Sequence, residues 1–477
     1  MSSPKVHVGL AGAVHTNMPG NDTGLYDSVI DGLTALSRSM GFDLSVLREP
    51  LHSEEDGRKA AAFMDDHKVD LTLFFNASLP FGRVILPLAR VGSALGLWAV
   101  PEPTTSGVLQ LNSFCGLNMV GSIIGSYLGQ HDIPFKWFYG VPESELFQER
   151  LRVTLRAIAA IKALREARIA QIGGLANGFE NMYIDERVLE KRLGAYMQSR
   201  YTVEEIVDKA KRYSEKDARS EAAVFASEAK RGKGSVSAES MEKSARVFLA
   251  LRDFARENGY TALAVSCWSR FQEVYGIAVC GALSRLNQNG IVAPCEADIT
   301  SAVMMIALNA MNGERAALND MVAFDEKDDT LNLWHCGVAP ACWADSSGVA
   351  WDNHFNIGHY REDSWEGSGV IADMRFRPGP VTVAAVASGF DKLLILTGDV
   401  MEKEGYAGSS GWVGHLKVNG QPVGIREVLN TILVKRVNHH YPTAFGDLTN
   451  ELNELASWKG ITVLDPVPYK PYMQGPR

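Results

Sequence analysis

The 477-residue chain lacks any long hydrophobic segment. No uninterrupted apolar stretch reaches the ~18 residues that a membrane-spanning helix needs, and the longest candidate is interrupted by Asn76, Arg83 and Arg90. The first residues also lack the apolar segment of a secretory signal peptide, and a strand-like run begins at Lys5. We therefore expect a cytoplasmic protein that does not enter a membrane.

Clustered positive charge is scarce as well. The formal net charge is −9, and the one basic cluster, Lys230-Arg231-Gly232-Lys233, is short and flanked by glycine and serine, as in a solvated loop. Binding to nucleic acid needs a clustered positive surface, so we expect no nucleic-acid partner. The glycines at 9, 12, 173, 174 and 178 do not complete a Gly-x-Gly-x-x-Gly motif, so we predict no nucleotide cofactor.

Cysteines are few and unpaired in sequence. None of the six, at positions 115, 267, 280, 295, 336 and 342, forms a Cys-x-x-Cys motif, and all have apolar neighbours. In a cytoplasmic chain this pattern is typical of buried thiols, not of disulfides or a zinc site.

The sequence has the composition of a folded globular protein, with 46% hydrophobic and 22% charged residues. Its length is too great for one hydrophobic core and predicts two to four domains. Strand and helix patterns alternate at first, from the strand at Lys5–Leu10 and the helix at Gly24–Met40, through a buried strand at Leu71–Phe75, to the strand at Pro134–Phe138. A similar strand leading into a glycine turn starts at Arg168. From Thr330 the pattern changes to short strands separated by Pro and Gly turns, such as His415–Val418.

These patterns predict an α/β protein with three domains. Residues 1–143 form an N-terminal α/β domain and residues 144–325 a second one, both Rossmann-like with parallel sheets. Residues 326–477 form a C-terminal domain with an antiparallel, barrel-like sheet and a terminal helix.

Acidic and imidazole side chains recur in the C-terminal half. Glu296 and Asp320 are followed by His335 and then by the pair His439-His440. Carboxylate oxygens and one or two imidazoles suit a divalent metal that is not soft, with manganese favoured and cobalt or magnesium as substitutes. Adjacent residues in an extended chain point to opposite sides, so one histidine of the pair would bind metal, and the sequence does not decide which. Asp298 could either support a ligand through a hydrogen bond or cap the following helix.

The runs that carry these residues resemble the L-fucose isomerase and L-arabinose isomerase family. The runs are Cys267-Trp268, Tyr275-Gly276, Ala282-Leu283, Cys295-Glu296-Ala297-Asp298, Phe324-Asp325, Leu333-Trp334-His335-Cys336-Gly337, Arg377-Pro378-Gly379-Pro380 and Asn438-His439-His440. The resemblance covers about residues 260–440. Its fucose-isomerase branch implies a metal held by Glu296, Asp320 and one of the late pair, whereas its arabinose-isomerase branch adds His335. This chain combines features of both branches, so the substrate cannot be inherited from either.

The resemblance implies a homohexamer with the active site between α/β and β-rich domains. The expected activity interconverts a free aldose, a pentose or a 6-deoxyhexose, with its ketose through a cis-enediol, with Glu296 and Asp320 as metal ligands and acid/base groups. Two alternatives stay open. One is an isomerase or epimerase for a modified or anionic sugar, and the other is a non-catalytic sugar-binding or regulatory protein.

Candidate sugar contacts come from both halves of the chain. Trp268 and Phe271 could present apolar faces to a sugar, and Arg270 could be structural or could bind an anionic group. The resemblance implies that the N-terminal domain of an adjacent subunit contacts the sugar tail. Further candidates, chosen by their positions after strands or in glycine-rich loops, are His15, Asn17, Phe81, Trp98 and Met182.

Overall fold

The computed structural model describes residues 3–15, 17–18, 24–129, 133–175, 178–232, 234, 236–267, 270–355, 358–361 and 364–475, excepting the side chains of 358–361 and 364–367. The chain divides into two compact units, residues 4–162 and residues 163–477. The boundaries expected near residues 143 and 325 stay predictions. Among the described helices, none is long and apolar enough to cross a membrane.

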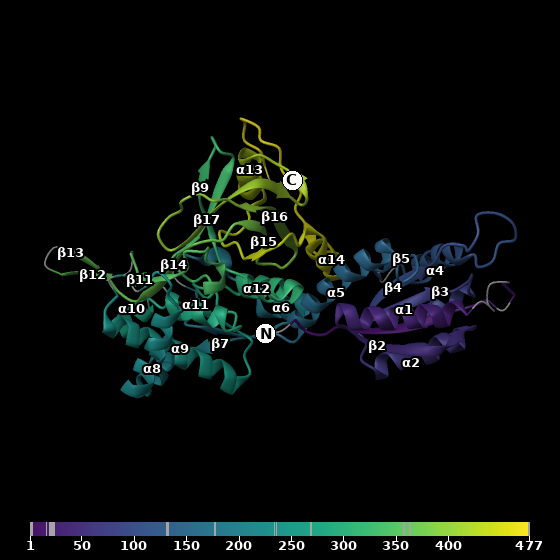
Figure 1. Ribbon diagram of the computed structural model, residues 1–477, viewed down its shortest axis with the longest axis horizontal. Coiled ribbons are helices and arrows are strands. Elements are labelled where there is room, and N and C mark those ends of the chain that lie inside the picture. The colour runs from purple at the N-terminus through teal and green to yellow at the C-terminus, as the bar shows by residue number, and fades with distance from the viewer. Residues whose placement is uncertain are drawn as a thin grey trace. The chain divides into compact units, whose positions relative to one another are not determined.

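The smaller unit is built on a five-stranded parallel sheet with the order β2-β1-β3-β4-β5 (Figure 1). Its strands are β1 His7–Ala13, β2 Asp43–Leu51, β3 Leu71–Asn76, β4 Ala94–Ala99 and β5 Lys136–Tyr139. Its helices are α1 Leu25–Met40, α2 Glu54–Asp66, α3 Ile85–Leu88, α4 Ser113–Leu128 and α5 Glu145–Arg165, with a 3₁₀ turn at Gly82–Val84. Parallel pairing follows from the alternation of strands with helices, because each helix returns the chain to the end of the sheet at which the previous strand began.

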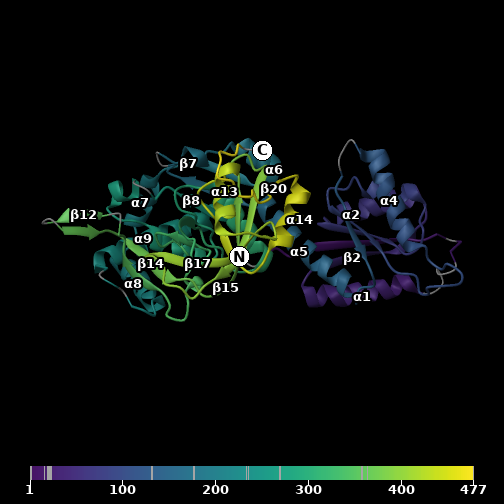
Figure 2. The same cartoon turned by 90° about the horizontal axis from the view of Figure 1, so that it is seen from above.

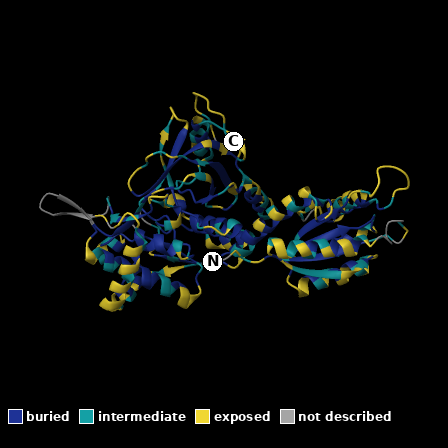
Figure 3. Cartoon of the chain, in the orientation of Figure 1, coloured by how far each residue is buried: buried dark blue, intermediate teal, exposed yellow. Residues whose placement is uncertain are grey.

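Two apolar layers cover this sheet. Val8 and Leu10 pack in a cluster with residues of α1 and α5, whereas Ala11 and Ala13 pack in a second cluster with residues of α2, α3 and α4. Side chains alternate between the two faces along a strand, so residues 8 and 10 pack on one face of the sheet and residues 11 and 13 on the other. Figure 2 shows α1 on one side of the sheet and α2 and α4 on the other, and Figure 3 shows buried strands beneath helices with exposed outer faces.

The larger unit begins with a second parallel sheet of three strands, in the order β7-β6-β8. The strands are β6 Arg168–Ile172, β7 Tyr196–Tyr201 and β8 Ala262–Val265. The helices are α6 Glu186–Leu193, α7 Val203–Lys211, α8 Glu215–Glu228, α9 Ala238–Asn258, α10 Arg270–Tyr275, α11 Cys280–Gln288 and α12 Ile299–Asn312, with a 3₁₀ turn at Glu180–Met182. Helix α12 is almost entirely buried, so the turn before it lies in the interior of the unit.

A mostly antiparallel ten-stranded sheet completes the larger unit. Its strands are β9 Asp320–Asp325, β10 Thr330–His335, β11 Ala350–Asn353, β14 Val370–Arg375, β15 Gly379–Val386, β16 Lys392–Val400, β17 Ser409–Val418, β18 Gln421–Pro422, β19 Thr443–Phe445 and β20 Thr462–Val463. A separate hairpin pairs β12 Gly358–Arg361 with β13 Ser364–Gly367. The remaining helices are α13 Ile425–Lys435 and α14 Thr449–Lys459, with a 3₁₀ turn at Ala341–Trp343. The structure thus confirms a mixed α/β chain with parallel sheets first and an antiparallel sheet last.

Candidate functional site

Glu296 lies in a turn between α11 and α12. Its φ is 60° and that of Ala297 is 58°, a left-handed conformation that residues with a Cβ adopt rarely. The turn is held because the Ala297 N–H donates to the carbonyl of Val265 at 3.0 Å and the Gln171 amide donates to the carbonyl of Ala297 at 2.9 Å. These hydrogen bonds hold both residues in a backbone conformation that costs about 1–3 kcal/mol for each. The result is a glutamate carboxylate 3.1 Å from Nε2 of His440.

Asp298 performs both of the roles that the sequence left open. It caps the N-terminus of α12, because Oδ1 accepts from the Ser301 N–H at 3.2 Å and from the Thr300 hydroxyl at 2.7 Å. Its Oδ2 accepts from the Ser301 hydroxyl and from Nδ1 of His440, the latter at 2.9 Å. The carboxylate is completely buried, and these hydrogen bonds with the charge of His440 lower its pKa although burial raises it.

His440 is therefore held in a defined orientation. With Nδ1 donating to Asp298, Nε2 points toward the two other carboxylates, Glu296 at 3.1 Å and Asp320 at 3.7 Å, and a metal would bind there in place of the second ring proton. A carboxylate behind an imidazole is the usual support of a metal-binding histidine. Burial lowers the pKa of His440, but Asp298, Glu296 and Asp320 outweigh it and raise the pKa to about 10.

Asp320 is placed opposite His440 by backbone pairing. The two residues form an isolated antiparallel bridge, and the Tyr441 N–H donates to the carbonyl of Asn319 at 2.7 Å. Oδ1 of Asp320 is buried and has no hydrogen-bond partner among the described residues. Burial raises the pKa of Asp320, and the charge of Glu296 adds to this, while His335 and His440 oppose it. A carboxyl group with a raised pKa suits proton transfer near neutral pH.

His335 ends β10, beside Trp334, which pairs with Asp320 across the β9–β10 ladder. Its Nδ1 accepts the Cys336 N–H at 2.9 Å, whereas its buried Nε2 has no partner in the described part of the chain. Burial lowers the pKa of His335, but Cys336, Asp320 and Glu296 outweigh burial and raise it. In the neutral ring the proton lies on Nε2, because Nδ1 accepts the Cys336 N–H.

His439 is the more exposed histidine of the pair. Asn181 Nδ2 lies 3.0 Å from its Nδ1, and Phe179 stacks on the ring with centroids 5.5 Å apart. Burial, followed by the charge of His440, lowers the pKa of His439. Met182, a predicted sugar contact, follows Asn181 and is 1% exposed, so its side chain belongs to the core.

Two groups of potential ligand atoms thus overlap at His440. Glu296, His439 and His440 form one, and Asp320, His335 and His440 form the other, with the atoms of each group within 4.8 Å of one another. Among the described residues, Oδ1 of Asp320 and Nε2 of each of the three histidines are buried without a hydrogen-bond partner. Carboxylate oxygens and imidazole nitrogens that are close together and lack hydrogen-bond partners are suited to bind a hard or borderline divalent cation. The five predicted ligands are therefore close together, and their metal-binding role stays a prediction.

The other predicted sugar contacts of the larger unit are not grouped with these ligands. Trp268 lies outside the described residues. Phe271 is 0% exposed in α10, so its face is covered by the protein core and cannot meet a sugar. Arg270 is exposed, and its guanidinium forms ion pairs with Glu204 and with Glu273, the latter at 3.0 Å. These pairs fit the structural role that the sequence allowed for this arginine.

Three of the N-terminal candidates lie together in the smaller unit. The His15 ring stacks on Phe81 with centroids 4.6 Å apart, and the Asn17 N–H donates to His15 Nδ1 at 3.1 Å. They follow β1 and β3, at the carboxyl edge of the parallel sheet, where ligands of such sheets usually bind. Trp98, by contrast, is completely buried and donates its indole N–H to the carbonyl of Gly140.

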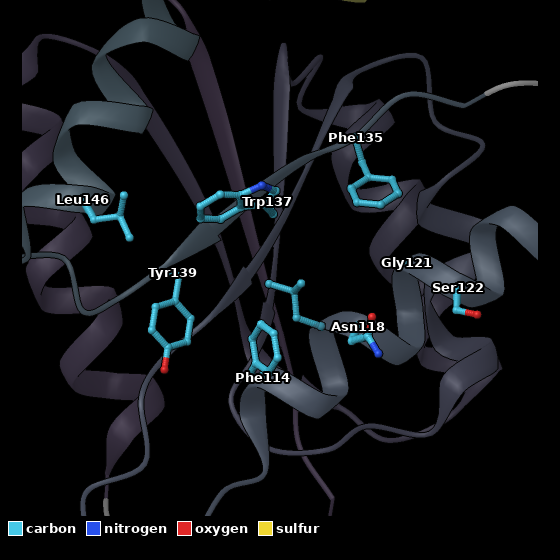
Figure 4. A pocket seen from close by; sticks show the side chains of 9 residues that line it. Phe114, Asn118, Gly121, Ser122, Phe135, Trp137, Tyr139 and Leu146 are labelled. Atoms are coloured by element: carbon cyan, nitrogen blue, oxygen red, sulfur yellow. The ribbon is translucent and has the colours of Figure 1, made fainter.

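The smaller unit also has an apolar hollow of about 710 Å³. It is lined by Phe114, Leu117, Asn118, Gly121, Ser122, Phe135, Trp137, Tyr139 and Leu146, from α4, β5 and the start of α5 (Figure 4). None of the nine lining residues in the described part of the chain carries a carboxylate, an imidazole or a thiol.

Sequence reasoning missed one group of side chains. Cys280, Cys295 and Cys336 come together in the core of the larger unit, next to His335 and His354. Their spacing in sequence gave no signal, since contacts between distant segments create the group. The expectation that all six cysteines are buried is wrong for Cys115 and Cys342, which are exposed.

Comparison with known proteins supports an enzyme of the sugar isomerase class. No family model matches the chain. The sulfoquinovose isomerase of Priestia aryabhattai is 26% identical over 400 residues, covering 82% of this chain and 84% of that protein. Those of Alkalicoccus urumqiensis and Clostridium sp. (strain MSTE9) are 27% and 28% identical, covering 77% and 76% of this chain and 80% and 78% of their own lengths. The resemblance to the L-fucose and L-arabinose isomerases stays a prediction at the level of that subtype.

One solved structure is also similar in part. A solute-binding protein from Agrobacterium vitis, bound with alpha-D-tagatopyranose, covers 65% of this chain and 90% of its own at 13% identity. Its TM-score of 0.18 is too low to support any conclusion about fold or function.

Proposed function

We propose that this chain is a metal-dependent aldose–ketose isomerase for an anionic sugar, with sulfoquinovose as the first substrate to test. The observation that carries the proposal is the convergence of Glu296 and Asp320 on Nε2 of His440, with Asp298 fixing the tautomer of that imidazole. The names of the similar proteins supply the substrate class. An anionic sugar was the alternative left open by the sequence, and it replaces the free pentose or 6-deoxyhexose as the preferred substrate.

Glu296, Asp320 and His440 are the residues that would hold the metal, with His439 as a fourth ligand. His335 is less suited, because its Nδ1 accepts a backbone N–H, that of Cys336, which places the proton of the neutral ring on Nε2. The partner of His439 Nδ1 is the side-chain amide of Asn181, which can turn its oxygen to that atom and leave Nε2 of His439 able to bind metal. Manganese is the preferred ion, with cobalt or magnesium as substitutes, since the ligands are oxygen and imidazole. When bound, the ion would polarise the sugar carbonyl and lower the energy of negative charge developing on the substrate oxygens.

The protein groups supply the proton transfers. The raised pKa of Asp320 suits it to take the proton from C2 of the aldose and return it to C1, which gives the ketose through a cis-enediol. Glu296 can move the second proton between the two sugar oxygens. The Nε2–H of His335 can donate a hydrogen bond to the oxygen on which charge develops. Asp320 carries the carbon proton between the two steps, so the completed reaction leaves the proton count of the sugar and of the protein unchanged.

The test is a panel of sugars assayed by NMR for ketose formation with manganese present. The panel contains sulfoquinovose, a sugar phosphate, L-fucose and L-arabinose. We expect turnover of sulfoquinovose, with Asp320→Asn inactive. The matched control Asp325→Asn, at the half-exposed far end of β9, should be fully active.

The outcomes separate the parts of the proposal. Turnover of neutral sugars alone would remove the anionic substrate and keep the isomerase. Full activity of Asp320→Asn would remove the assigned proton carrier, and failure with every sugar of the panel would contradict the function.

A further inference from the structure

Four buried or half-buried thiols from different elements lie beside the carboxylate site. Cys267 follows β8, Cys280 is the first residue of α11, Cys295 precedes Glu296, and Cys336 follows β10. The sulfur atoms of Cys280 and Cys336 are 3.6 Å apart, and all four cysteines are free thiols. The proposed isomerase mechanism uses none of them.

An imidazole completes this group. The ligand atoms of Cys280, Cys336 and His354 lie within 4.8 Å of one another, and so do those of Cys295, His335 and Cys336. Cys336 is common to the two groups. His354, directly after β11, is 3% exposed, so the group is shielded from water. Cys267 belongs to a third group, with Cys295 and Glu296, on the carboxylate side.

The distances match a tetrahedral site of sulfur and nitrogen ligands. Zinc–sulfur bonds of about 2.3 Å at tetrahedral angles place two sulfur atoms about 3.8 Å apart. The observed separation of 3.6 Å between Cys280 and Cys336 is close to this value. Separations of up to 4.8 Å among Cys280, Cys336 and His354 would close to it with side-chain shifts of about 1 Å. Cys295 is grouped with Cys336 but not with Cys280 or His354, so its side chain would move farther to complete the site.

The backbone around the thiols is fixed by hydrogen bonds to one strand. The Ala278 N–H donates to the carbonyl of Ser368 just before β14, and the Ala372 N–H of β14 donates to the carbonyl of Gly337, both at 3.1 Å. The segments before Cys280 and after Cys336 are therefore tied to the same strand. Cys280 also sits at the positive N-terminal end of α11, which favours the thiolate form that binds metal.

We propose that Cys280, Cys336 and His354, with Cys295 as the fourth ligand, bind a thiophilic divalent ion of the zinc class. Three thiolates and one imidazole form a closed ligand set typical of structural zinc. Its soft sulfur ligands distinguish this thiol site from the neighbouring oxygen-rich site. The inference does not depend on the proposed isomerase activity. An ion bound to Cys336 would nevertheless fix the residue that follows His335.

A spectroscopic test uses the unaltered protein. Metal-stripped protein is titrated with cobalt(II), and sulfur-to-cobalt charge-transfer absorption is recorded in the near ultraviolet. We expect this absorption to grow to a stoichiometry of about one ion per chain and to disappear when zinc is added. Cobalt bound by carboxylates and imidazoles alone gives no such absorption. A titration without the charge-transfer absorption would therefore overturn the proposal even if the enzyme is active.

Variants then locate the ion. Elemental analysis after desalting should show zinc falling from about one ion per chain to near zero in Cys280→Ser and in His354→Gln. Cys342→Ser, which removes an exposed thiol of the same unit, and Glu296→Gln should both keep zinc. Zinc retained in both Cys280→Ser and His354→Gln would refute the assignment. Zinc lost in Glu296→Gln alone would place the ion at the carboxylate site instead, which also refutes it.

Discussion

Replacing Asp298 with asparagine tests whether the tautomer of His440 controls metal binding. Asparagine caps helices as well as aspartate, so its side-chain oxygen can keep accepting the Ser301 N–H at the start of α12. The amide group then occupies the position of Oδ2, where it meets Nδ1 of His440, now 2.9 Å from the carboxylate. Two donors cannot face each other, so Nδ1 must become an acceptor and the ring proton must move to Nε2.

In the neutral ring, this change removes the Nε2 lone pair that would bind a metal beside Glu296 and Asp320. Loss of a supporting partner behind a metal-binding histidine weakens affinity about 10–100-fold, which corresponds to about 1.4–2.7 kcal/mol. The metal-free fold should lose less than about 3 kcal/mol, because one charge-assisted hydrogen bond is lost and the cap is kept.

The assay is calorimetric titration of manganese into stripped protein, with urea unfolding of the metal-free form alongside. Ser214→Ala is the control, because it removes the cap of α8 without touching the site, and its manganese affinity should be unchanged. Manganese affinity of Asp298→Asn within about twofold of the wild type, with an intact fold, would refute the tautomer argument.

Four further predictions follow from the same structure. Glu296→Gln should abolish turnover and manganese binding while Glu314→Gln, an exposed residue paired with Arg377, should change neither; elemental analysis and the ketose assay check this. Turnover in heavy water should place deuterium at C1 of the ketose, whereas complete retention of a C2 label would indicate a direct hydride shift. Gly337→Ala should destabilise the fold by at least about 2 kcal/mol in urea unfolding, because φ is 112° and an added Cβ would lie 2.6 Å from Cβ of Ile371. Burial raises the pKa of Asp345, but its hydrogen bonds with Ser347 and Arg375 lower it overall. The stabilisation by Arg375 should therefore be full above about pH 4 and lost as the pH falls through the lowered pKa. Since Arg375 is 42% exposed, Arg375→Gln should cost up to about 1 kcal/mol at pH 7 in the same assay, and progressively less as the pH falls below about 4.

Local patterns predicted the early part of the fold well. The helix expected at Gly24–Met40 is α1, Leu25–Met40, and the strand expected at Leu71–Phe75 is β3, Leu71–Asn76. These elements obey regular periods and have clear glycine or capping ends, so local sequence is sufficient. The strand expected at His415–Val418 is only the end of β17, which starts at Ser409, because pairing with β10 and β14 extends it beyond its local signal.

The candidate site was predictable in its members but not in its geometry. The sequence could not choose between His439 and His440, whereas backbone pairing with Asp320 and the hydrogen bond to Asp298 favour His440 as the principal ligand. Neither signal is visible without the tertiary structure. Phe271 illustrates the opposite error, because an aromatic residue near a motif can equally be part of the core, and here it is.

The end of β10 explains how two ligand chemistries can occur in one small region. His335 is grouped with Asp320 and His440, whereas the next residue, Cys336, is grouped with Cys280 and His354. The two side chains are neighbours, because Sγ of Cys336 lies 3.3 Å from Nδ1 of His335, so a single strand end serves an oxygen-rich group and a sulfur-rich group side by side. The bond from the Cys336 N–H to His335 Nδ1 links the two groups through the backbone. A change in the position of Cys336 therefore reaches the Nε2 proton of His335 without any contact between the thiols and the substrate.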